Sequence, residues 1–343
     1  MQSFTISGGS GRSQILIGQR LEALPEHVPL EGSIIVTDET VSRIYGARFP
    51  RAPVITVGCG EEIKTLETAS GIYRELIRLE ADRTSFLIGI GGGVVCDITG
   101  FVASTYLRGL RFGFAATTLL AQVDASVGGK NGVNLDGYKN MIGLFNQPEV
   151  VLCDPGLLPS LDPADIGCGM AEIVKHGAIS DADLFRYLEG HAREALELNP
   201  EVIERLVTDS VLIKSSIVNR DEREGGERRK LNFGHTFGHA VEKTLGSPHG
   251  EAVSIGMVLA GLLSVRRGLL AEAELQRLVS LLESLELPTH ISTAPEPMLE
   301  ALGKDKKREG EYIRFVLLKA IGEAVVESIP LQEIRSAAKE MLG

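Results

Sequence analysis

The sequence contains no tryptophan, and aromatic residues make up only 5% of its 343 residues. A platform of aromatic side chains on which bases or sugars stack is therefore not expected. Basic residues are also outnumbered, because 35 Lys and Arg against 46 Asp and Glu give a net charge of −11. Such a chain binds the phosphate backbone of nucleic acid poorly, so we expect no nucleic-acid partner.

Long hydrophobic runs and a leader segment are missing as well. The longest apolar stretch, residues 252–265, is shorter than the roughly 20 residues that a membrane span needs. The N-terminal segment MQSFTISGGSGRS has no basic region followed by an apolar run, so it does not resemble a signal peptide. We therefore expect a cytoplasmic protein with no membrane partner.

Cysteine is scarce, and no two cysteines form the C-x-x-C pair of a structural zinc knuckle. A chain of this length needs no disulfides for stability, and isolated thiols suit a reducing compartment. Free cysteine behaves as a small hydrophobic residue. We expect buried, unreactive thiols at Cys59, Cys96, Cys153 and Cys168.

The first half of the chain alternates strand-like and helix-like segments. The strand-like segments are short and rich in β-branched residues, and they are 33–38, 53–58, 85–93, 111–120 and 149–155. Residues 62–80 carry apolar side chains at helical spacing, whereas 124–147, rich in Gly and Asn, is predicted to be a long irregular loop. This alternation indicates a parallel sheet covered by helices on both faces.

The second half is mostly helical. Helical periodicity marks the segments 166–189, 200–218, 230–245, 251–267 and 271–285. Strand signals return only at 312–318. The change of pattern lies near 155–165, so the predicted fold class is α/β, with a Rossmann-like parallel-sheet domain at 1–160 and a mostly α-helical domain at 161–343.

A glycine-rich turn, GIGGGVVCDITGF at 89–101, follows a strand and opens a helix. Consecutive glycines let the backbone approach a ligand, and the helix N-terminus offers free N–H groups to a pyrophosphate. The spacing is not G-x-G-x-x-G, and Asp97 in the first turn also suits a simple helix start. Asp38 ends an earlier strand, where an acid that binds a ribose often lies.

Two helical segments carry candidate metal ligands. GMAEIVKH at 169–176 places Glu172 and His176 on one helix face, together with Lys175. LNFGHTFGHAVE at 231–242 places His235 and His239 one turn apart. The glycines beside them, at 234 and 238, each cost a helix roughly 1 kcal/mol, which suggests that another group approaches closely there.

A third histidine, His249, stands just before a further helix, whose N-terminus keeps the imidazole neutral and able to bind metal. Histidines and a carboxylate with one open position are the ligands of a catalytic zinc. Spacing alone leaves open which three residues bind the metal among Glu172, His176, His235, His239 and His249.

Together these motifs resemble the 3-dehydroquinate synthase family of sugar-phosphate cyclases over nearly the whole chain. The motifs that carry the resemblance are GGGVVCDITGFVASTYLRG (91–109), TTLLAQVDASVGGKNGVN (117–134), YKNMIGLFNQP (138–148), GMAEIVKHG (169–177), DEREGG (221–226), LNFGHTFGHA (231–240), HGEAVSIGM (249–257) and DKK (305–307). The resemblance implies an N-terminal NAD domain and a helical metal- and substrate-binding domain. It also implies a homodimer.

The family reaction converts 3-deoxy-D-arabino-heptulosonate 7-phosphate to 3-dehydroquinate and phosphate. The resemblance implies that NAD⁺ takes a hydride from C5, that phosphate leaves by β-elimination, that NADH returns the hydride, and that the ring closes by an aldol step. A substrate with a carboxylate and a phosphate needs a local cationic site, which the acidic total conceals.

The resemblance also assigns residues to roles. It implies zinc or cobalt bound by Glu172, His235 and His249, and catalytic roles for His239, Glu224, Lys175 and Asp124. The implied substrate contacts are Arg108, Lys130, Asn140, Lys214, Arg228, Asn232 and Lys306 or Lys307, with Arg108 often at the phosphate in a neighbouring subunit's site. The implied NAD contacts are Asp38, Glu61, Lys64, Gly92, Gly93, Val94, Asp97, Thr117, Thr118 and Lys139.

Some positions depart from the usual family pattern, namely Cys96, Ala116, Tyr138, Cys168 and His176. None of them removes a charged substrate contact. One alternative is a cyclase of the 2-deoxy-scyllo-inosose or valiolone synthase type, whose substrates lack the carboxylate that Lys214 and Arg228 would bind. The others are a metal-dependent polyol dehydrogenase, disfavoured by Glu172 and by the DEREGG and GGKNG motifs, and an inactive regulator.

Overall fold

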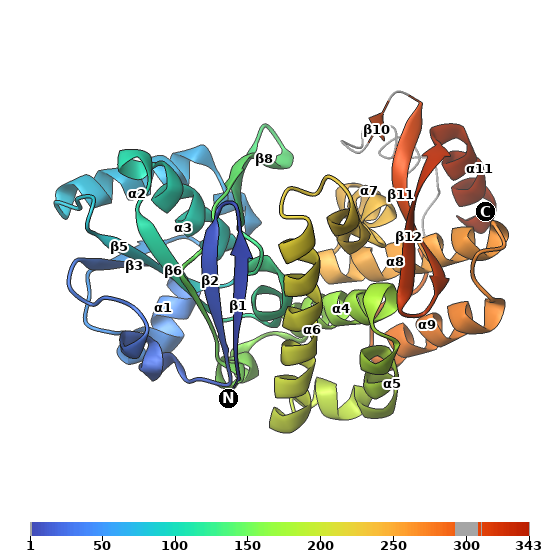
Figure 1. Ribbon diagram of the computed structural model, residues 1–343, viewed down its shortest axis with the longest axis horizontal. Coiled ribbons are helices and arrows are strands. Elements are labelled where there is room, and N and C mark those ends of the chain that lie inside the picture. Colours follow the sequence, from blue (N-terminus) through green and yellow to red (C-terminus); the bar gives the residue numbers. More distant parts are fainter. Residues whose placement is uncertain (1, 292–307, 310, 343) are drawn as a thin grey trace. The chain divides into compact units, whose positions relative to one another are not determined.

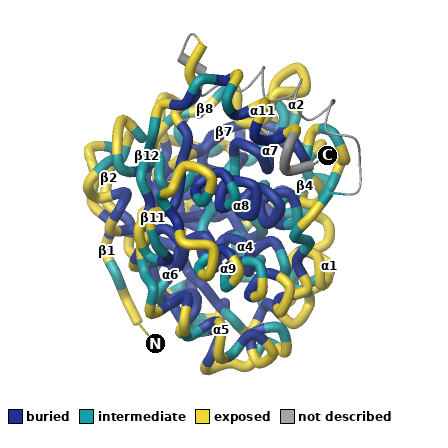
Figure 2. Tube along the Cα trace, turned by 90° about the vertical axis from the view of Figure 1, so that its right-hand side faces the viewer, coloured by how far each residue is buried: buried dark blue, intermediate teal, exposed yellow. Residues whose placement is uncertain are grey.

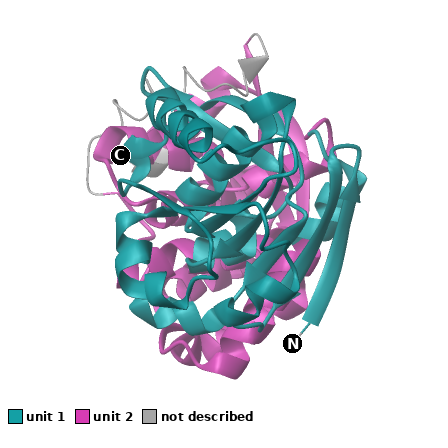
Figure 3. Cartoon of the chain, turned by 90° about the vertical axis from the view of Figure 1, so that its left-hand side faces the viewer, with its two compact units in different colours: residues 1–161, 214–223 teal, residues 162–213, 224–343 magenta. Residues whose placement is uncertain are grey.

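The computed structural model describes residues 2–291, 308–309 and 311–342. The chain divides into two compact units (Figure 3), one of residues 1–161 and 214–223, the other of 162–213 and 224–343. Residues 214–223 therefore belong to the first unit, although the residues before and after them belong to the second. The predicted boundary near 155–165 contains the division at 161/162, but the return at 214–223 left no signal in the sequence.

A seven-stranded sheet forms the centre of the first unit (Figure 1), in the order β1-β2-β9-β6-β5-β3-β4. All neighbouring pairs are parallel except β1 with β2. The strands are β1 Gln2–Gly8, β2 Gly11–Ile17, β3 Ser33–Asp38, β4 Val54–Val57, β5 Phe86–Gly91, β6 Arg111–Ala116 and β9 Val150–Cys153. The predicted α/β fold class is confirmed. Strand β1 was missed because it buries only Ile6 and so lacks an apolar pattern, and β2 was missed although it buries Ile15, Leu16 and Ile17.

Helices α1 Glu39–Tyr45, α2 Leu66–Arg78 and α3 Gly93–Thr105 connect these strands. Helix α2 buries Ala69, Ile72 and Leu76, at the predicted helical spacing, and Thr65 caps it by accepting a hydrogen bond from the N–H of Thr68. Strand β5 is buried on both faces, as expected for a central parallel strand.

The predicted irregular loop at 124–147 is wrong. A hairpin of β7 Lys130–Leu135 and β8 Tyr138–Phe145 occupies most of it. Asp136 and Gly137 both have positive φ, the conformation of a two-residue hairpin turn. The glycines in this segment permit close packing rather than disorder, since a Cβ at Gly132 would lie 2.7 Å from the Ile142 carbonyl oxygen.

The second unit is mainly helical. Its elements are α4 Pro163–Ser180, α5 Ala182–Leu196, α6 Pro200–Arg220, α7 His235–Leu245, α8 His249–Arg266, α9 Glu272–Ser284, β10 Arg308–Glu309, β11 Tyr312–Ala320, β12 Glu323–Pro330 and α11 Leu331–Leu342. The predicted helix 166–189 is two helices, because the Asp181 carboxylate accepts hydrogen bonds from the N–H groups of Asp183 and Leu184 and starts α5. Strand β12 and helix α11 were not predicted.

Helix α8 carries the longest apolar stretch of the sequence. Nearly all of its residues are buried (Figure 2). The stretch is therefore apolar because the helix packs inside the second unit. Among the helices of the described residues, none combines the length and the hydropathy that a membrane span requires.

Candidate functional site

Helices α7 and α8 meet backbone to backbone. A Cβ at Gly256 of α8 would lie 2.0 Å from the carbonyl oxygen of Gly234 and 2.7 Å from the nitrogen of Gly238. The group that approaches these glycines closely, as their positions predict, is therefore helix α8. Because His235 is the first residue of α7 and His249 the first of α8, this contact fixes both histidines near each other.

Three side chains of the second unit converge. The Nε2 atoms of His235 and His249 each lie 3.5 Å from Oε1 of Glu172, whose side chain is 1% exposed. The ligand atoms of the three residues all lie within 4.8 Å of one another, which is a suitable geometry for one metal ion. His239 packs edge-on against His235, at 5.5 Å between ring centroids, and is exposed. His176 is fully buried in α4.

The second nitrogen of each imidazole also has a partner. Nδ1 of His235 lies 3.1 Å from the carbonyl oxygen of Phe233, so it donates there and leaves the Nε2 lone pair free for a metal. Nδ1 of His249 lies 3.7 Å from Oε2 of Glu242. We did not predict Glu242, although it stands one turn beyond His239 on α7. Both rings thus direct Nε2 toward Glu172.

Burial and charge give the two histidines different pKa values. Burial lowers the pKa of His235 well below its usual value, and the charge of Glu172 opposes this only in part. Burial also lowers the pKa of His249, but side-chain hydrogen bonds to Glu172 and Glu242 outweigh it and raise the pKa to about 9. In the metal-free protein at neutral pH, His235 is therefore neutral and His249 is protonated. The expectation that the N-terminus of α8 keeps His249 neutral is wrong, because the carboxylates of Glu172 and Glu242 favour the charged ring.

Cys168, a departure from the family pattern, supports the start of α8. Its Sγ accepts a hydrogen bond of 3.3 Å from the N–H of Gly250, the residue after His249. Cys96 and Cys153 are also buried, as predicted, but Cys59, in the segment after β4, is exposed. The expectation of buried thiols is wrong for Cys59.

The carboxylate of Glu172 also pairs with Lys175, one helical turn away, and both side chains are almost fully buried. Nearby in sequence, Arg228 is 2% exposed within the 3-10 helix η7 Glu227–Asn232. Asn232 donates from Nδ2 to a carboxylate oxygen of Glu224, which has a φ of +60°. The second unit thus holds two buried cations and an oriented carboxylate.

The first unit contains the glycine turn between β5 and α3. A Cβ at Gly92 would lie 2.9 Å from Thr118, and one at Gly93 would lie 2.9 Å from Ala125, so no side chain fits at either position. Thr117 is buried, and its Oγ1 has no hydrogen-bond partner among the described residues. A ligand that reaches this turn would meet the free N–H groups of the first turn of α3, which includes Val94.

The other predicted cofactor residues lie around this turn in the first unit. Lys64 pairs with Asp97 and donates to Oδ1 of Asn140 at 2.7 Å. Burial raises the pKa of Asp97, although the ammonium of Lys64 opposes the shift. Asp38 accepts a hydrogen bond from the N–H of Val41 and so starts α1. Glu61 lies in the 3-10 helix η3 Glu61–Ile63, and Lys139 is exposed on β8.

Asp124 lies in the π-helical segment η5 Ala121–Ala125 and pairs with Lys214, whose Nζ is 2.7 Å from its Oδ1. Lys214 lies in the C-terminal part of α6, which belongs to the first unit. Lys130 is exposed at the start of β7, and Arg108 is exposed with a φ of +71°. Lys306 and Lys307 lie outside the described residues.

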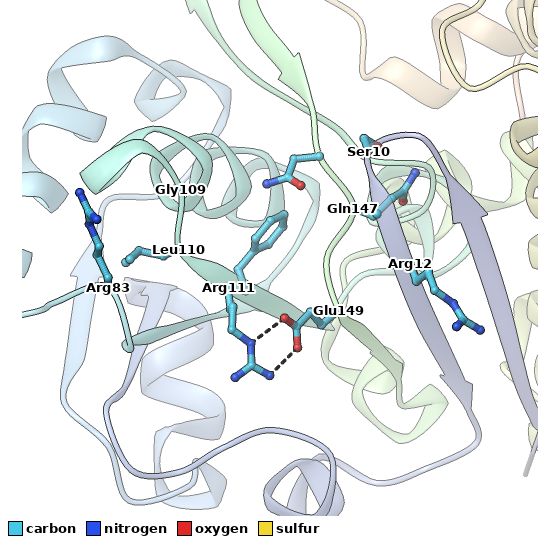
Figure 4. Close-up of a pocket in the computed structure, with 11 residues that line it drawn as sticks. Ser10, Arg12, Arg83, Gly109, Leu110, Arg111, Gln147 and Glu149 are labelled. Atoms are coloured by element: carbon cyan, nitrogen blue, oxygen red, sulfur yellow. Dashed lines mark hydrogen bonds and ion pairs between the residues drawn. The ribbon is translucent and has the colours of Figure 1, made fainter.

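A separate open hollow of about 640 Å³ lies in the first unit, at the start of β6 (Figure 4). Arg111 and Glu149 form a two-bond ion pair in it, of 2.7 and 2.8 Å, and Arg12 and Arg83 lie at its opposite ends. None of the predicted site residues within the described part of the chain lines it. The hollow therefore does not belong to the candidate site.

Comparison with known families accounts for most of the chain. A model described as 3-dehydroquinate synthase N-terminal matches residues 54–167, and one described as 3-dehydroquinate synthase C-terminal matches residues 169–308. The 3-dehydroquinate synthase of Halorhodospira halophila is 45% identical over 311 residues, which is 88% of this chain and 88% of that protein.

Two solved structures share the fold over nearly the whole chain. A 2-epi-5-epi-valiolone synthase from Streptomyces hygroscopicus, with NAD⁺ and Zn²⁺ bound, is 31% identical with a TM-score of 0.86, over 94% of both chains. A 2-deoxy-scyllo-inosose synthase, complexed with carbaglucose-6-phosphate, NAD⁺ and Co²⁺, is 25% identical with a TM-score of 0.89, over 99% of this chain and 100% of that one.

Proposed function

The chain belongs to the 3-dehydroquinate synthase family, and from this premise we propose that it converts 3-deoxy-D-arabino-heptulosonate 7-phosphate to 3-dehydroquinate and phosphate. It is thus a lyase that eliminates phosphate and serves the shikimate pathway of aromatic biosynthesis. The observation that carries the proposal is the convergence of Glu172, His235 and His249, in a chain 45% identical to a curated synthase.

The donor set suits a divalent metal. One buried carboxylate and two imidazoles with ordered second nitrogens are the ligands of a catalytic zinc, so Glu172, His235 and His249 would hold Zn²⁺ or Co²⁺. The glycine turn suits NAD⁺, because Gly92 and Gly93 bring the backbone of the turn against Thr118 and Ala125, the first turn of α3 has free N–H groups, and Thr117 has an unused buried hydroxyl. When bound, NAD⁺ accepts and returns a hydride, and the metal acts as a Lewis acid toward hydroxyl groups.

The chain's own side chains bind and orient the substrate and move protons. Lys175 and Arg228 are buried cations that can hold a carboxylate or phosphate without competition from water. The proposed proton carriers are Glu224, which accepts a hydrogen bond from Asn232, and His239, which is exposed beside His235. In the first unit, Asp124 orients Lys214, and Lys130 and Asn140 offer further donors.

The remaining predicted cofactor contacts surround the glycine turn. They are Asp38, Glu61, Lys64, Val94, Asp97, Thr118 and Lys139, and we propose that they bind NAD⁺. The first unit would then be the NAD domain and the second unit the metal domain. Residues 214–223, which include the end of α6, would belong to the NAD domain. Lys306 remains a proposed substrate contact from sequence alone.

A homodimer is part of this proposal. Leu107 and Arg108 both have positive φ, with Leu107 41% exposed, so the turn after α3 projects an arginine and an apolar side chain into solvent. This suits an Arg108 that serves the substrate phosphate of a neighbouring subunit. Free rather than disulfide-bonded cysteines suit the proposed cytoplasmic location.

The closest alternative functions differ in their products. The two cyclase structures are 25% and 31% identical to this chain, compared with 45% for the curated synthase, and Lys214 and Arg228 suit a substrate with a carboxylate. A polyol dehydrogenase would accumulate NADH, whereas the proposed reaction has no net redox change.

One assay tests the function. Heptulosonate phosphate, NAD⁺ and Zn²⁺ should give stoichiometric phosphate and no net NADH, measured by phosphate release and by absorbance at the NADH band. Dialysis against a chelator should remove the activity, and Zn²⁺ or Co²⁺ should restore it, because Glu172, His235 and His249 would have lost their metal. Phosphate release that persists after complete metal removal, or net NADH, would refute the proposal.

Metal binding should depend on pH. His249 has a pKa of about 9 in the metal-free protein, so below that pH a metal ion must displace its proton, whereas the lowered pKa of His235 leaves that ring neutral. The apparent affinity for Zn²⁺ should therefore increase about tenfold per pH unit from pH 6.5 to 8 and level off above 9. Calorimetry in two buffers of different ionisation enthalpy should detect one released proton at pH 7.5, and a release of none would contradict this reasoning.

A further inference from the structure

Asn134, near the end of β7, makes three hydrogen bonds to two separate segments of the first unit. Its backbone N–H donates to the carbonyl oxygen of Lys64 at 2.7 Å. Its side-chain Nδ2 donates to Oε1 of Glu61 at 2.8 Å, and its Oδ1 accepts from the backbone N–H of Asn140 at 2.8 Å. One side chain thus joins the η3 segment to the second strand of the hairpin.

The amide group is suited to this position because it donates on one side and accepts on the other. A carboxylate of the same shape could still accept from Asn140 but could not donate to Glu61. A serine or alanine could not reach both partners. The chemistry of the two bonds therefore requires asparagine rather than a generic polar residue.

The bond to Asn134 supports an uncommon backbone conformation at Asn140. Its φ is +51°, in the left-handed region that few residues other than glycine adopt. The backbone N–H is bound by Asn134, and the side-chain Oδ1 accepts from Lys64, which in turn pairs with Asp97. The orientation of Asn140 is therefore set at its backbone by Asn134 of β7 and at its side chain by Lys64, a predicted NAD contact.

We propose that Asn134 is a positioning residue that holds Glu61 for NAD⁺ on one side and Asn140 for the substrate on the other. This inference rests on the proposed function, which assigns Glu61 and Lys64 to the cofactor and Asn140 to the substrate. When NAD⁺ orders Glu61, Asn134 becomes ordered too, and ordering Asn140 for the substrate then costs less entropy. NAD⁺ and the substrate should therefore increase each other's affinity by the same factor.

The two bonds can be separated by substitution in the full-length, metal-loaded enzyme. Asn134→Asp keeps the acceptor for Asn140 but places a second carboxylate against Glu61, so the Kd for NAD⁺ should rise about tenfold while the KM for heptulosonate phosphate changes less than twofold. Asn134→Ala removes both bonds, so both constants should rise about tenfold. NAD⁺ binding is measured by calorimetry and KM by phosphate release.

Asp136→Asn is the matched control, because it alters an exposed residue of the same hairpin turn and should leave both constants unchanged. Melting temperatures of all variants separate positioning from unfolding, and the isosteric Asn134→Asp carries the test if the alanine variant is unstable. Unchanged constants in both Asn134 variants, or equal changes of the two constants in Asn134→Asp, would overturn the inference. Failure of the wild-type enzyme to bind NAD⁺ would instead overturn the proposed function, and this inference with it.

Discussion

His235→Ala should lose bound metal and turnover together. The imidazole supplies one of three ligands, and its Nδ1 is held by the Phe233 carbonyl so that Nε2 faces Glu172, and its removal leaves only two ligands. Lewis-acid stabilisation contributes several kcal/mol to such reactions, so phosphate release should decrease by about 10³-fold or more. Metal content is measured by atomic emission on the purified protein and activity by phosphate release.

His191→Ala provides the control for this variant. Nδ1 of His191 also contacts a backbone carbonyl oxygen, that of Tyr187 at 2.9 Å, but its ring stacks on Tyr187 in α5 rather than facing Glu172. Metal content and turnover should therefore stay at the wild-type level. A His235→Ala enzyme that retains one metal ion per chain would show that the ligand set has been assigned wrongly.

Gly256→Ala should impair stability and metal affinity at once. The new methyl group would lie 2.0 Å from the carbonyl oxygen of Gly234, a backbone atom that cannot rotate away, so α7 and α8 must separate. We expect the free energy of unfolding to decrease by about 3 kcal/mol. Since His235 and His249 begin these two helices, the Kd for Co²⁺ should increase about 10- to 100-fold.

Gly190→Ala tests whether this effect is specific. Gly190 lies within α5, and a Cβ there would meet no atom within 4 Å, so alanine should leave metal binding unchanged and stabilise the helix by up to about 1 kcal/mol. Urea unfolding and a Co²⁺ titration followed by absorbance measure both quantities. A stable Gly256→Ala protein with wild-type Co²⁺ affinity would contradict the role assigned to the helix contact.

The sequence predicted the central sheet well because its strands are buried on both faces and therefore rich in β-branched residues, as in β3 and β5. The hairpin β7–β8 was missed because its glycines serve strand-to-strand and strand-to-helix packing, which depends on residues far away in the sequence. Gly132 packs against the Ile142 carbonyl of the neighbouring strand, and Gly100 on the helix α3 makes room for Asn131 of β7. The break between α4 and α5 was missed because it depends on the single side chain of Asp181.

The sequence predicted some residues of the candidate site but not the residues that orient them. Spacing alone left five possible metal ligands, and the resemblance to a known family selected Glu172, His235 and His249, which the structure brings together. Glu242 and Asn134 were missed, although each is the last residue of a quoted motif, because each contacts another predicted site residue and was not itself expected to bind a ligand. Residues that orient others leave no spacing pattern, because their partners come from separate loops and helices.

The insertion of 214–223 into the first unit limits how this protein can be divided. A fragment of residues 1–161 would lack Lys214, leaving Asp124 without its cation. It would also lack Glu222, whose carboxylate accepts hydrogen bonds from the Ser10 backbone at 3.2 Å and from Gln147 at 3.3 Å. The two units are therefore not exchangeable modules, and a recombination at residue 161 would give the first unit a foreign 214–223 segment in place of the one that pairs with its own Asp124, Ser10 and Gln147.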